Sequence, residues 1–288
     1  MTALTRIQST LVVLGSTLVS TGMGILTVSA PAQAASFSEV RSEFAFSNFS
    51  HSAVSTNTQT FTDTLTIGTQ GSVTALSSAL ANFTDGSAAE IQASNSIASL
   101  TAGSGRNYVG LAESQAALVG DFVLVAHETF SFDFDGFLEL STGIDDDSLE
   151  SAFALGGLGF SVSGVPLSST GTPWVDQLNL VASLDTPGVD DVLDTNLFQL
   201  LLAGNQSNII IKSLGFDRQV GGRNESLLIG FTGTYQRTFT ETTLVSLAES
   251  KTGVAAVQAV PAPSLIWGLL SYGGLGLMGK LRQRPGRS

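Results

Sequence analysis

Apolar and polar residues alternate along several stretches of the chain with the two-residue period of a β-strand. The clearest stretch covers residues 130–135, where Phe130, Phe132 and Phe134 share one face and Ser and Asp residues occupy the other. Because a buried phenyl side chain removes about 150 Å² or more from water, three of them on one face predict the centre of a hydrophobic core.

A second alternating stretch covers residues 60–67. Phe61, Leu65 and Ile67 share one face, and four threonines occupy the other. Asp63 interrupts the apolar face, and a charge in that position is typical of a strand at the edge of a sheet. We therefore predict an edge strand here.

Many shorter strands with turns between them are predicted along the rest of the chain. They cover residues 44–49, 121–125, 137–140, 158–162, 177–184, 208–214, 227–235 and 237–247. Turn signals rich in Gly, Pro and Asp lie at residues 85–86, 103–105, 135–136, 186–188 and 221–222. Short strands without alternating helices favour an all-β fold, namely an antiparallel sandwich or a jelly roll. Residues 77–82 and 192–203 are alternatively helical, the latter because its leucines recur at helical spacing.

The beginning of the chain has the pattern of a secretory signal peptide. Arg6 precedes an apolar stretch at residues 11–28, and Ala32 and Ala34 form an A-x-A site before Ala35. We expect the secretion machinery to export the chain and signal peptidase to cut after Ala34. An uncleaved membrane anchor is the alternative interpretation.

The last 29 residues contain a proline box, an uncharged run and a basic tip, in that order. The run, residues 265–279, would form a helix of about 22 Å, shorter than the ~30 Å hydrocarbon core of a bilayer. Long cationic side chains reach the interface and hold such an end on the cytoplasmic side. These cations are Lys280, Arg282, Arg284 and Arg287. A short membrane helix is therefore predicted, with a buried core helix as the alternative.

This order of three parts resembles the PEP-CTERM sorting signal of exported proteins in Gram-negative bacteria and cyanobacteria. Val260, Pro261, Ala262 and Pro263 stand where that family usually has V-P-E-P, so Ala262 replaces the glutamate. The resemblance implies attachment to the membrane through the C-terminus, exosortase as a processing partner, and a location at the membrane, on the cell surface or outside the cell. The central portion, residues 130–239, is similar to domains of cyanobacterial PEP-CTERM proteins, a likeness that implies no activity.

We therefore divide the chain into a signal peptide (1–34), an exported β-domain (35–247), a tether with the proline box (248–264) and the sorting signal (265–288). The two ends hold five of the twelve basic residues. The exported body keeps seven basic and 24 acidic residues, a formal net charge of −17. Such a charge disfavours nucleic acid as a partner. The absence of cysteine excludes disulfides and thiolate zinc sites.

Acidic residues gather in the middle of the chain and provide oxygen ligands of the kind that calcium prefers. We expect a hairpin to bring the carboxylates of residues 133–135 close to those of residues 145–150. They are Asp133, Asp135, Asp145, Asp146, Asp147 and Glu150. A solvated acidic loop is the alternative, and we expect no cofactor other than calcium.

Trp174 follows a proline in a loop-like stretch, where an exposed indole could stack on a sugar ring. A tryptophan that plugs the end of the sandwich is the alternative. The two histidines, His51 and His127, complete no zinc-protease motif, and no G-x-S-x-G nucleophile motif occurs.

The sequence thus predicts a non-enzymatic protein of the cell surface or extracellular matrix that contacts extracellular polysaccharide. One alternative is a lectin-like module that binds carbohydrate or calcium. The second is a polysaccharide hydrolase, which would need Asp133 and Glu150 to face each other across a groove at about 5–10 Å.

Overall fold

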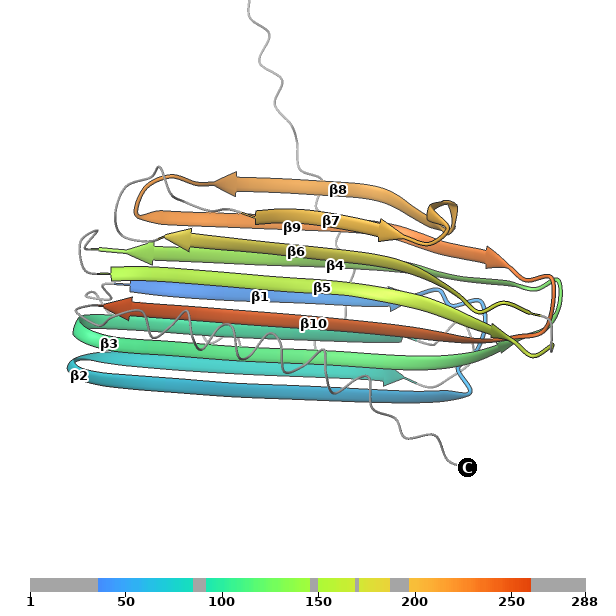
Figure 1. Cartoon of the computed structure of the whole chain (residues 1–288), viewed down its shortest axis with the longest axis horizontal. Helices are drawn as coiled ribbons and strands as arrows, with labels where there is room; N and C mark the ends of the chain where they lie inside the picture. Colours follow the sequence, from blue (N-terminus) through green and yellow to red (C-terminus); the bar gives the residue numbers. More distant parts are fainter. Residues whose placement is uncertain (1–35, 85–91, 146–149, 169–170, 187–196, 260–288) are drawn as a thin grey trace, which may run out of the picture. The chain divides into compact units, whose positions relative to one another are not determined.

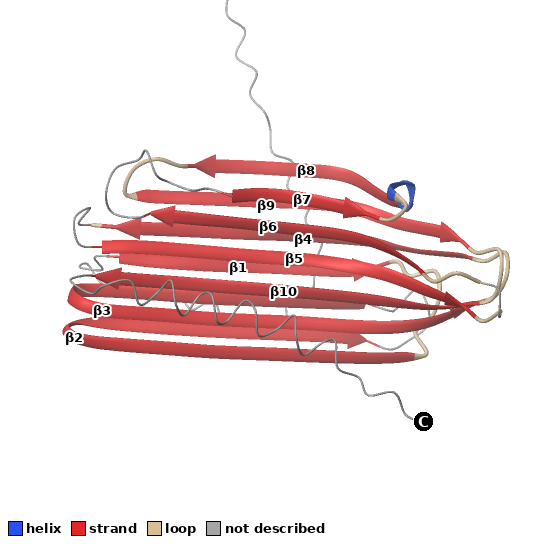
Figure 2. Ribbon diagram, viewed as in Figure 1, coloured by secondary structure: helices blue, strands red, loops and turns tan. Residues whose placement is uncertain are grey.

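The computed structural model describes residues 36–84, 92–145, 150–168, 171–186 and 197–259. These residues form ten β-strands and one short 3-10 helix, η1 (Gln206–Asn208). The strands are β1 (Ser36–Ser47), β2 (Ser55–Thr84), β3 (Gln92–Leu124), β4 (Thr129–Ile144), β5 (Glu150–Pro166), β6 (Trp174–Thr186), β7 (Leu197–Ala203), β8 (Ile209–Gln219), β9 (Asn224–Thr238) and β10 (Thr243–Ala259). The prediction of an antiparallel all-β fold is confirmed (Figure 2).

All ten strands belong to one antiparallel sheet, in the order β7-β6-β5-β10-β3-β1-β4-β9-β8, with β2 paired to β3 (Figure 1). The long strand β3 is the element that folds this sheet onto itself. Its first part pairs with β1, up to Gly103, and its second part pairs with β10, from Tyr108 onward. The backbone bends between them, where Gly105 and Asn107 have positive φ angles.

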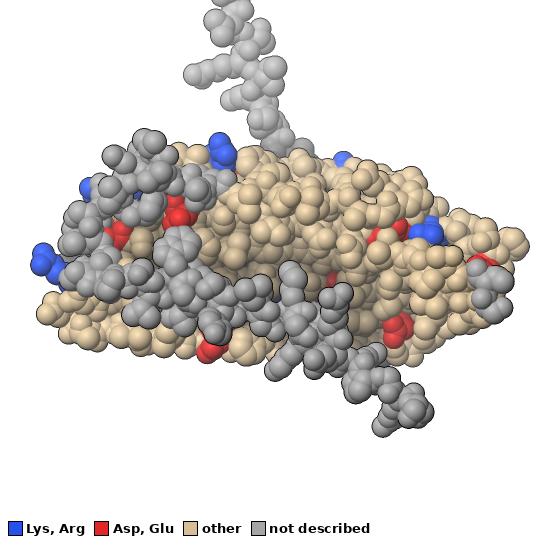
Figure 3. Space-filling view, in the orientation of Figure 1, with Lys and Arg blue, Asp and Glu red and all other residues tan. Residues whose placement is uncertain are grey.

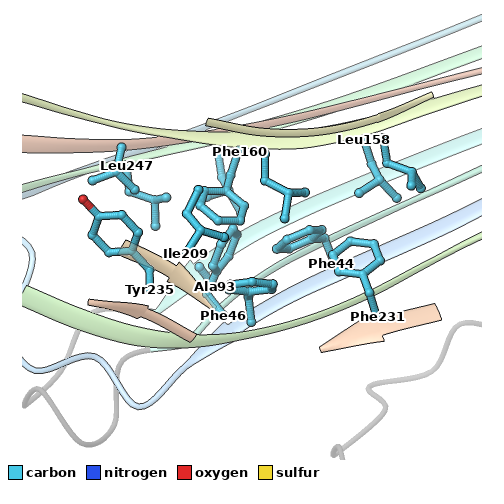
Figure 4. Packing of buried hydrophobic residues seen from close by; sticks show 14 of the residues in the cluster. Phe44, Phe46, Ala93, Leu158, Phe160, Ile209, Phe231, Tyr235 and Leu247 are labelled. Carbon is cyan, nitrogen blue, oxygen red and sulfur yellow. The ribbon is translucent and has the colours of Figure 1, made fainter. Parts of the chain in front are cut away.

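The bend gives the sheet two layers whose inner faces pack against each other. One layer contains β1, β4, β9 and β8, and the other contains β10, β5, β6 and β7. Aromatic rings fill the space between them: Phe160 on β5 lies 5.9 Å from Phe44 and 5.8 Å from Phe46 on β1, measured between ring centroids (Figure 4). Phe130, Phe132 and Phe134 are all buried on the inner face of β4, which confirms the predicted core.

The 60–67 stretch is part of β2, which pairs only with β3 among the described strands, so the predicted edge position is confirmed. Its apolar side chains lie on the outer face. Phe61 and Ile67 are each about half exposed, because their partners across β3, Gln115 and Val109, also point outward. The threonines lie on the opposite side of this strand and are exposed as well.

Both helical alternatives are wrong within the described residues. Residues 77–82 lie in β2, and Leu197–Ala203 forms β7. The leucine spacing that indicated a helix coincides with a two-residue alternation, in which Leu200 and Leu202 pack against the core. Residues 192–196 lie outside the described part.

The predicted tether is also wrong over residues 248–259, which belong to β10 between β3 and β5. Small residues that we interpreted as a linker are required by close packing between the layers. A Cβ added to Gly253 would lie 3.0 Å from Ile97 and 3.1 Å from Val40 on the opposite layer. The β-domain therefore continues to Ala259.

The predicted turn at residues 103–105 coincides with the bend of β3, whereas the one at residues 135–136 lies inside β4. The turn at residues 221–222 does connect β8 to β9. In the opposite sense, the stretch 237–247 was predicted as one strand, but it contains the end of β9, a loop and the start of β10.

The predicted signal peptide with Ala32, Ala34 and Ala35, the proline box, the uncharged run and the four C-terminal cations lie outside the described residues. Within the described ranges, none of the helical structure has the length and apolar character needed to cross a bilayer.

Candidate functional site

Two charged residues lie on the inner face of β10, where alternate side chains point between the layers. Glu249 is 2% exposed and Lys251 is 1% exposed. They follow Val245 and Leu247 on the same face, so the apolar alternation of this strand changes to two ionisable groups without leaving the core.

Asn95 completes this group from the opposite layer, where it lies on the inner face of β3 and is 2% exposed. Lys251 Nζ donates a 2.7 Å hydrogen bond to the backbone carbonyl oxygen of Asn95. The Asn95 side-chain amide donates to Glu249 Oε2. Glu249 Oε1 lies 3.9 Å from Lys251 Nζ, beyond hydrogen-bond distance. We name these three residues the buried triad.

Burial shifts the pKa values of the two ionisable groups of the triad. It raises the pKa of the Glu249 carboxyl, an effect that Lys251 and the Asn95 amide oppose, and it lowers the pKa of the Lys251 amine, an effect that Glu249 and Glu43 oppose. Desolvation thus favours the uncharged form of both groups. Phe44 adds to the apolar surroundings, with its ring centroid 5.6 Å from Nζ.

Two oxygen atoms of the triad, Asn95 Oδ1 and Glu249 Oε1, are buried without a hydrogen-bond partner. Unsatisfied buried polar atoms are costly and require a physical explanation. The triad thus brings an amine, a carboxyl and a carboxamide together inside the core, away from solvent.

Sequence analysis missed the triad because Glu249 and Lys251 fell in the predicted tether. A signal was present: residues 243–259 alternate with period two, and two charges replace apolar residues on one face. Nothing in the sequence around Asn95 indicated a buried polar residue, because that part of its strand consists mainly of Ser and Ala.

A second buried polar group surrounds Asp176 on β6, which is 1% exposed. Its Oδ2 accepts hydrogen bonds from Asn208 Nδ2 and Tyr235 Oη, both at 2.9 Å, and from Arg237 Nη1 at 3.1 Å. Its Oδ1 accepts from the Asn205 backbone N–H at 2.8 Å. Burial and this carboxylate raise the pKa of the Tyr235 hydroxyl. The carboxylate therefore joins β6 to β9 and to the segment before β8.

Trp174 lies beside this second group. The guanidinium carbon of Arg237 is 3.5 Å from the centroid of the indole, and the Phe239 ring is 5.8 Å away. Arg237 therefore covers one face of the ring. The indole is also packed against the core, and a Cβ added to Gly164 on β5 would overlap it. Stacking of a sugar on Trp174 stays a prediction that requires Arg237 to be displaced.

The predicted calcium ligands that the structure describes form two separate pairs, Asp133 with Asp135 and Asp145 with Glu150. Asp133 accepts hydrogen bonds from Lys212, Thr234 and Asn48, which lower the pKa of its carboxyl to about 2. Asp135 is on the same strand, and burial raises its pKa. Asp145 directly follows the end of β4, about 30 Å further along the extended chain.

Glu150 is buried at the far end of β4 from Asp133 and accepts from the Asp145 backbone N–H at 2.9 Å and from Tyr108 Oη at 3.3 Å. Burial raises the pKa of that tyrosine to about 12. Asp146 and Asp147 lie outside the described residues. Among the residues that the structure describes, no group of three or more metal-ligating side chains occurs.

Comparisons with models of protein families, with curated proteins and with solved structures give no match to this chain.

Proposed function

We propose that the chain is an exported, non-enzymatic structural protein of the cell surface or extracellular matrix. Its sandwich-like β-domain would be delivered by the N-terminal signal peptide and sorted through the C-terminal proline box, short membrane helix and cations. Signal peptidase, an exosortase, the membrane and extracellular polysaccharide are the partners that this proposal names.

The observation that supports this proposal best is that two buried carboxylates accept hydrogen bonds from other parts of the sheet. Asp176 joins β6 to β9, and Glu225 accepts hydrogen bonds from Thr186 on β6 and from the turn at Gly221. These groups connect strands that are distant in sequence, so they stabilise a rigid scaffold.

The exposed surface favours the same role. On the face shown in Figure 3, acidic and basic side chains are scattered over a largely uncharged surface. Strand β2 carries a single charged residue, Asp63, along its whole length. Strand β2 is rich in Ser and Thr, and their exposed hydroxyl groups are suited to hydrogen bonding with polysaccharide.

Export can be tested in a bacterial host that expresses the full chain with or without an exosortase. We expect protein outside the cytoplasm that begins at Ala35 and, when the exosortase is present, ends within the proline box. The double variant Pro261→Ala/Pro263→Ala should keep the N-terminal cut and lose the C-terminal one. Cytosolic protein that retains both Met1 and Ser288 would refute the proposal.

The lectin-like alternative is tested on the same material. Glycan-array binding that disappears with a chelator would replace the structural role with calcium-dependent recognition. Binding that disappears in Trp174→Ala but resists the chelator would assign the sugar contact to the indole. Release of reducing sugar from matrix polymers would instead favour the hydrolase.

A further inference from the structure

We propose that the buried triad is a self-modification site, at which Lys251 and Asn95 form an intramolecular amide cross-link with the help of Glu249. The bond would join the Nζ atom of Lys251 on β10 to the Cγ atom of Asn95 on β3. It would connect the two layers covalently in the middle of the core.

The placement of the three groups carries this inference. The Lys251 amine is already hydrogen-bonded to the backbone of Asn95, and the Asn95 carboxamide is hydrogen-bonded to Glu249. Glu249 has its other oxygen 3.9 Å from the amine. Its carboxyl thus contacts the amide through Oε2 and has Oε1 near the amine, so a small approach of Nζ to hydrogen-bond distance would let Glu249 exchange a proton with either group.

The dry surroundings prepare the reactants. A lysine amine attacks a carbonyl carbon only when it is neutral. Both side chains of the Lys251–Glu249 pair are fully buried, so the state in which the proton lies on Glu249 avoids two desolvated charges. The remaining charged group that acts on Lys251 is Glu43. Rotation of the Asn95 amide by half a turn would place its unpartnered Oδ1 against the protonated Glu249.

The reaction balances with the groups present. The Nζ lone pair attacks Cγ, and Glu249 donates its proton to the oxygen that becomes negatively charged. Glu249 then takes a proton from Nζ and passes it to Nδ2. The Cγ–Nδ2 bond breaks and ammonia leaves while the Cγ hydroxyl returns its proton to Glu249, and an amide between the two side chains remains. No oxidant, metal or cofactor enters the balance.

The cross-link would give this chain a constraint that it cannot obtain from disulfides, since it contains no cysteine. Residues 95 and 251 are 156 positions apart. A bond that closes a long loop restricts the unfolded chain, as a disulfide does, and so favours the folded state. This role suits a protein exposed to proteases, but the inference does not depend on export.

Intact-mass measurement of the purified, denatured protein tests the proposal. We expect the mass to be lower than that of the unmodified chain with the same termini by one molecule of ammonia. The deficit should disappear in Lys251→Met and in Glu249→Gln, since the first lacks the amine and the second cannot transfer the proton. Lys212→Met is the matched control, because it removes an exposed lysine from β8, and it should retain the deficit.

The alternatives give different results. A wild-type protein that is folded by circular dichroism and has the full unmodified mass overturns the proposal. A deficit that persists in Lys251→Met indicates a succinimide at an asparagine and overturns it equally. A full wild-type mass overturns the proposal by itself, and a cross-linked peptide in a digest of the wild-type protein distinguishes the amide from a succinimide, so the test remains valid if either triad variant fails to fold.

Discussion

Lys251 Nζ donates a 2.7 Å hydrogen bond to the carbonyl oxygen of Asn95, a residue 156 positions earlier in the chain and on the opposite layer of the sheet. The contact depends on the bend in β3, because that bend turns Asn95 toward β10 while the rest of the same strand pairs with β10 directly. This buried contact therefore forms only when the sheet is folded into two layers.

The aromatic core should determine the stability of the domain. Phe160 contacts Phe44, Phe46, Phe132 and Phe134 across the layers, so Phe160→Ala should lower the free energy of unfolding by about 3–5 kcal/mol. Phe61→Ala removes the same atoms from an exposed face and should change it by about 0.5 kcal/mol or less. Urea denaturation of both variants measures the difference, and equal losses would contradict the assigned inner and outer faces.

Asp176 should be essential to the contact between β6 and β9. Asp176→Ala would leave the Tyr235 hydroxyl, the Asn208 amide and the Arg237 guanidinium without their acceptor, at a cost of about 3–5 kcal/mol. The exposed Asp63→Ala variant serves as the control and should unfold like the parent protein. A thermal midpoint for Asp176→Ala close to that of the control would show that the carboxylate is not buried among these donors.

The bend in β3 should be sensitive to side-chain size at Gly103. A Cβ at this position would overlap the ring of Tyr108, so Gly103→Ala should destabilise the fold by about 1–3 kcal/mol. Gly230→Ala is the matched control, because nothing lies within 4 Å of the added atom. If calorimetry found the two variants equally stable, Tyr108 could not pack over Gly103 as described.

The contact between Asp133 and Lys212 should be visible in a titration. Hydrogen bonds from Lys212, Thr234 and Asn48 lower the pKa of Asp133 to about 2 from its ordinary value of 3.8. A carboxyl with a lowered pKa in the folded state stabilises that state above pH 4, and the contribution disappears as the pH falls toward 2. The gain is small, because the pair is partly exposed to solvent.

Carbon-detected NMR of the Asp133 carboxyl can measure this effect. Lys212→Ala should raise its pKa toward 3.8 by removing the strongest donor. Arg218→Ala removes another cation from the same strand and should leave the titration unchanged. An unaltered Asp133 pKa in the Lys212→Ala variant would show that the two side chains do not interact.

The fold class followed from sequence because alternation with period two depends only on which face of a strand is buried. Phe130, Phe132 and Phe134 gave the core for that reason. The long strands could not be predicted, because β2 and β3 are rich in Ser, Thr, Ala and Gly, which interrupt the apolar alternation of a strand. Small residues of this kind resemble those of a linker, which is why β10 was assigned in part to a tether.

The candidate site could not be predicted because it depends on long-range pairing. Asn95 and Lys251 meet only after β3 bends and β10 pairs with its second part. The acidic residues led to the opposite error. Proximity in sequence favoured a shared calcium site, but an extended strand separates Asp135 from Asp145 by about 30 Å.

The central claim, that an amide bond joins Lys251 to Asn95 across the layers, is tested most directly by tandem mass spectrometry of a tryptic digest. If the two are joined, cleavage after Lys251 should be blocked, and a branched peptide should link residues 42–106 to the segment that begins at residue 238. Efficient cleavage after Lys251, with residues 42–106 recovered as an unmodified linear peptide, would contradict it.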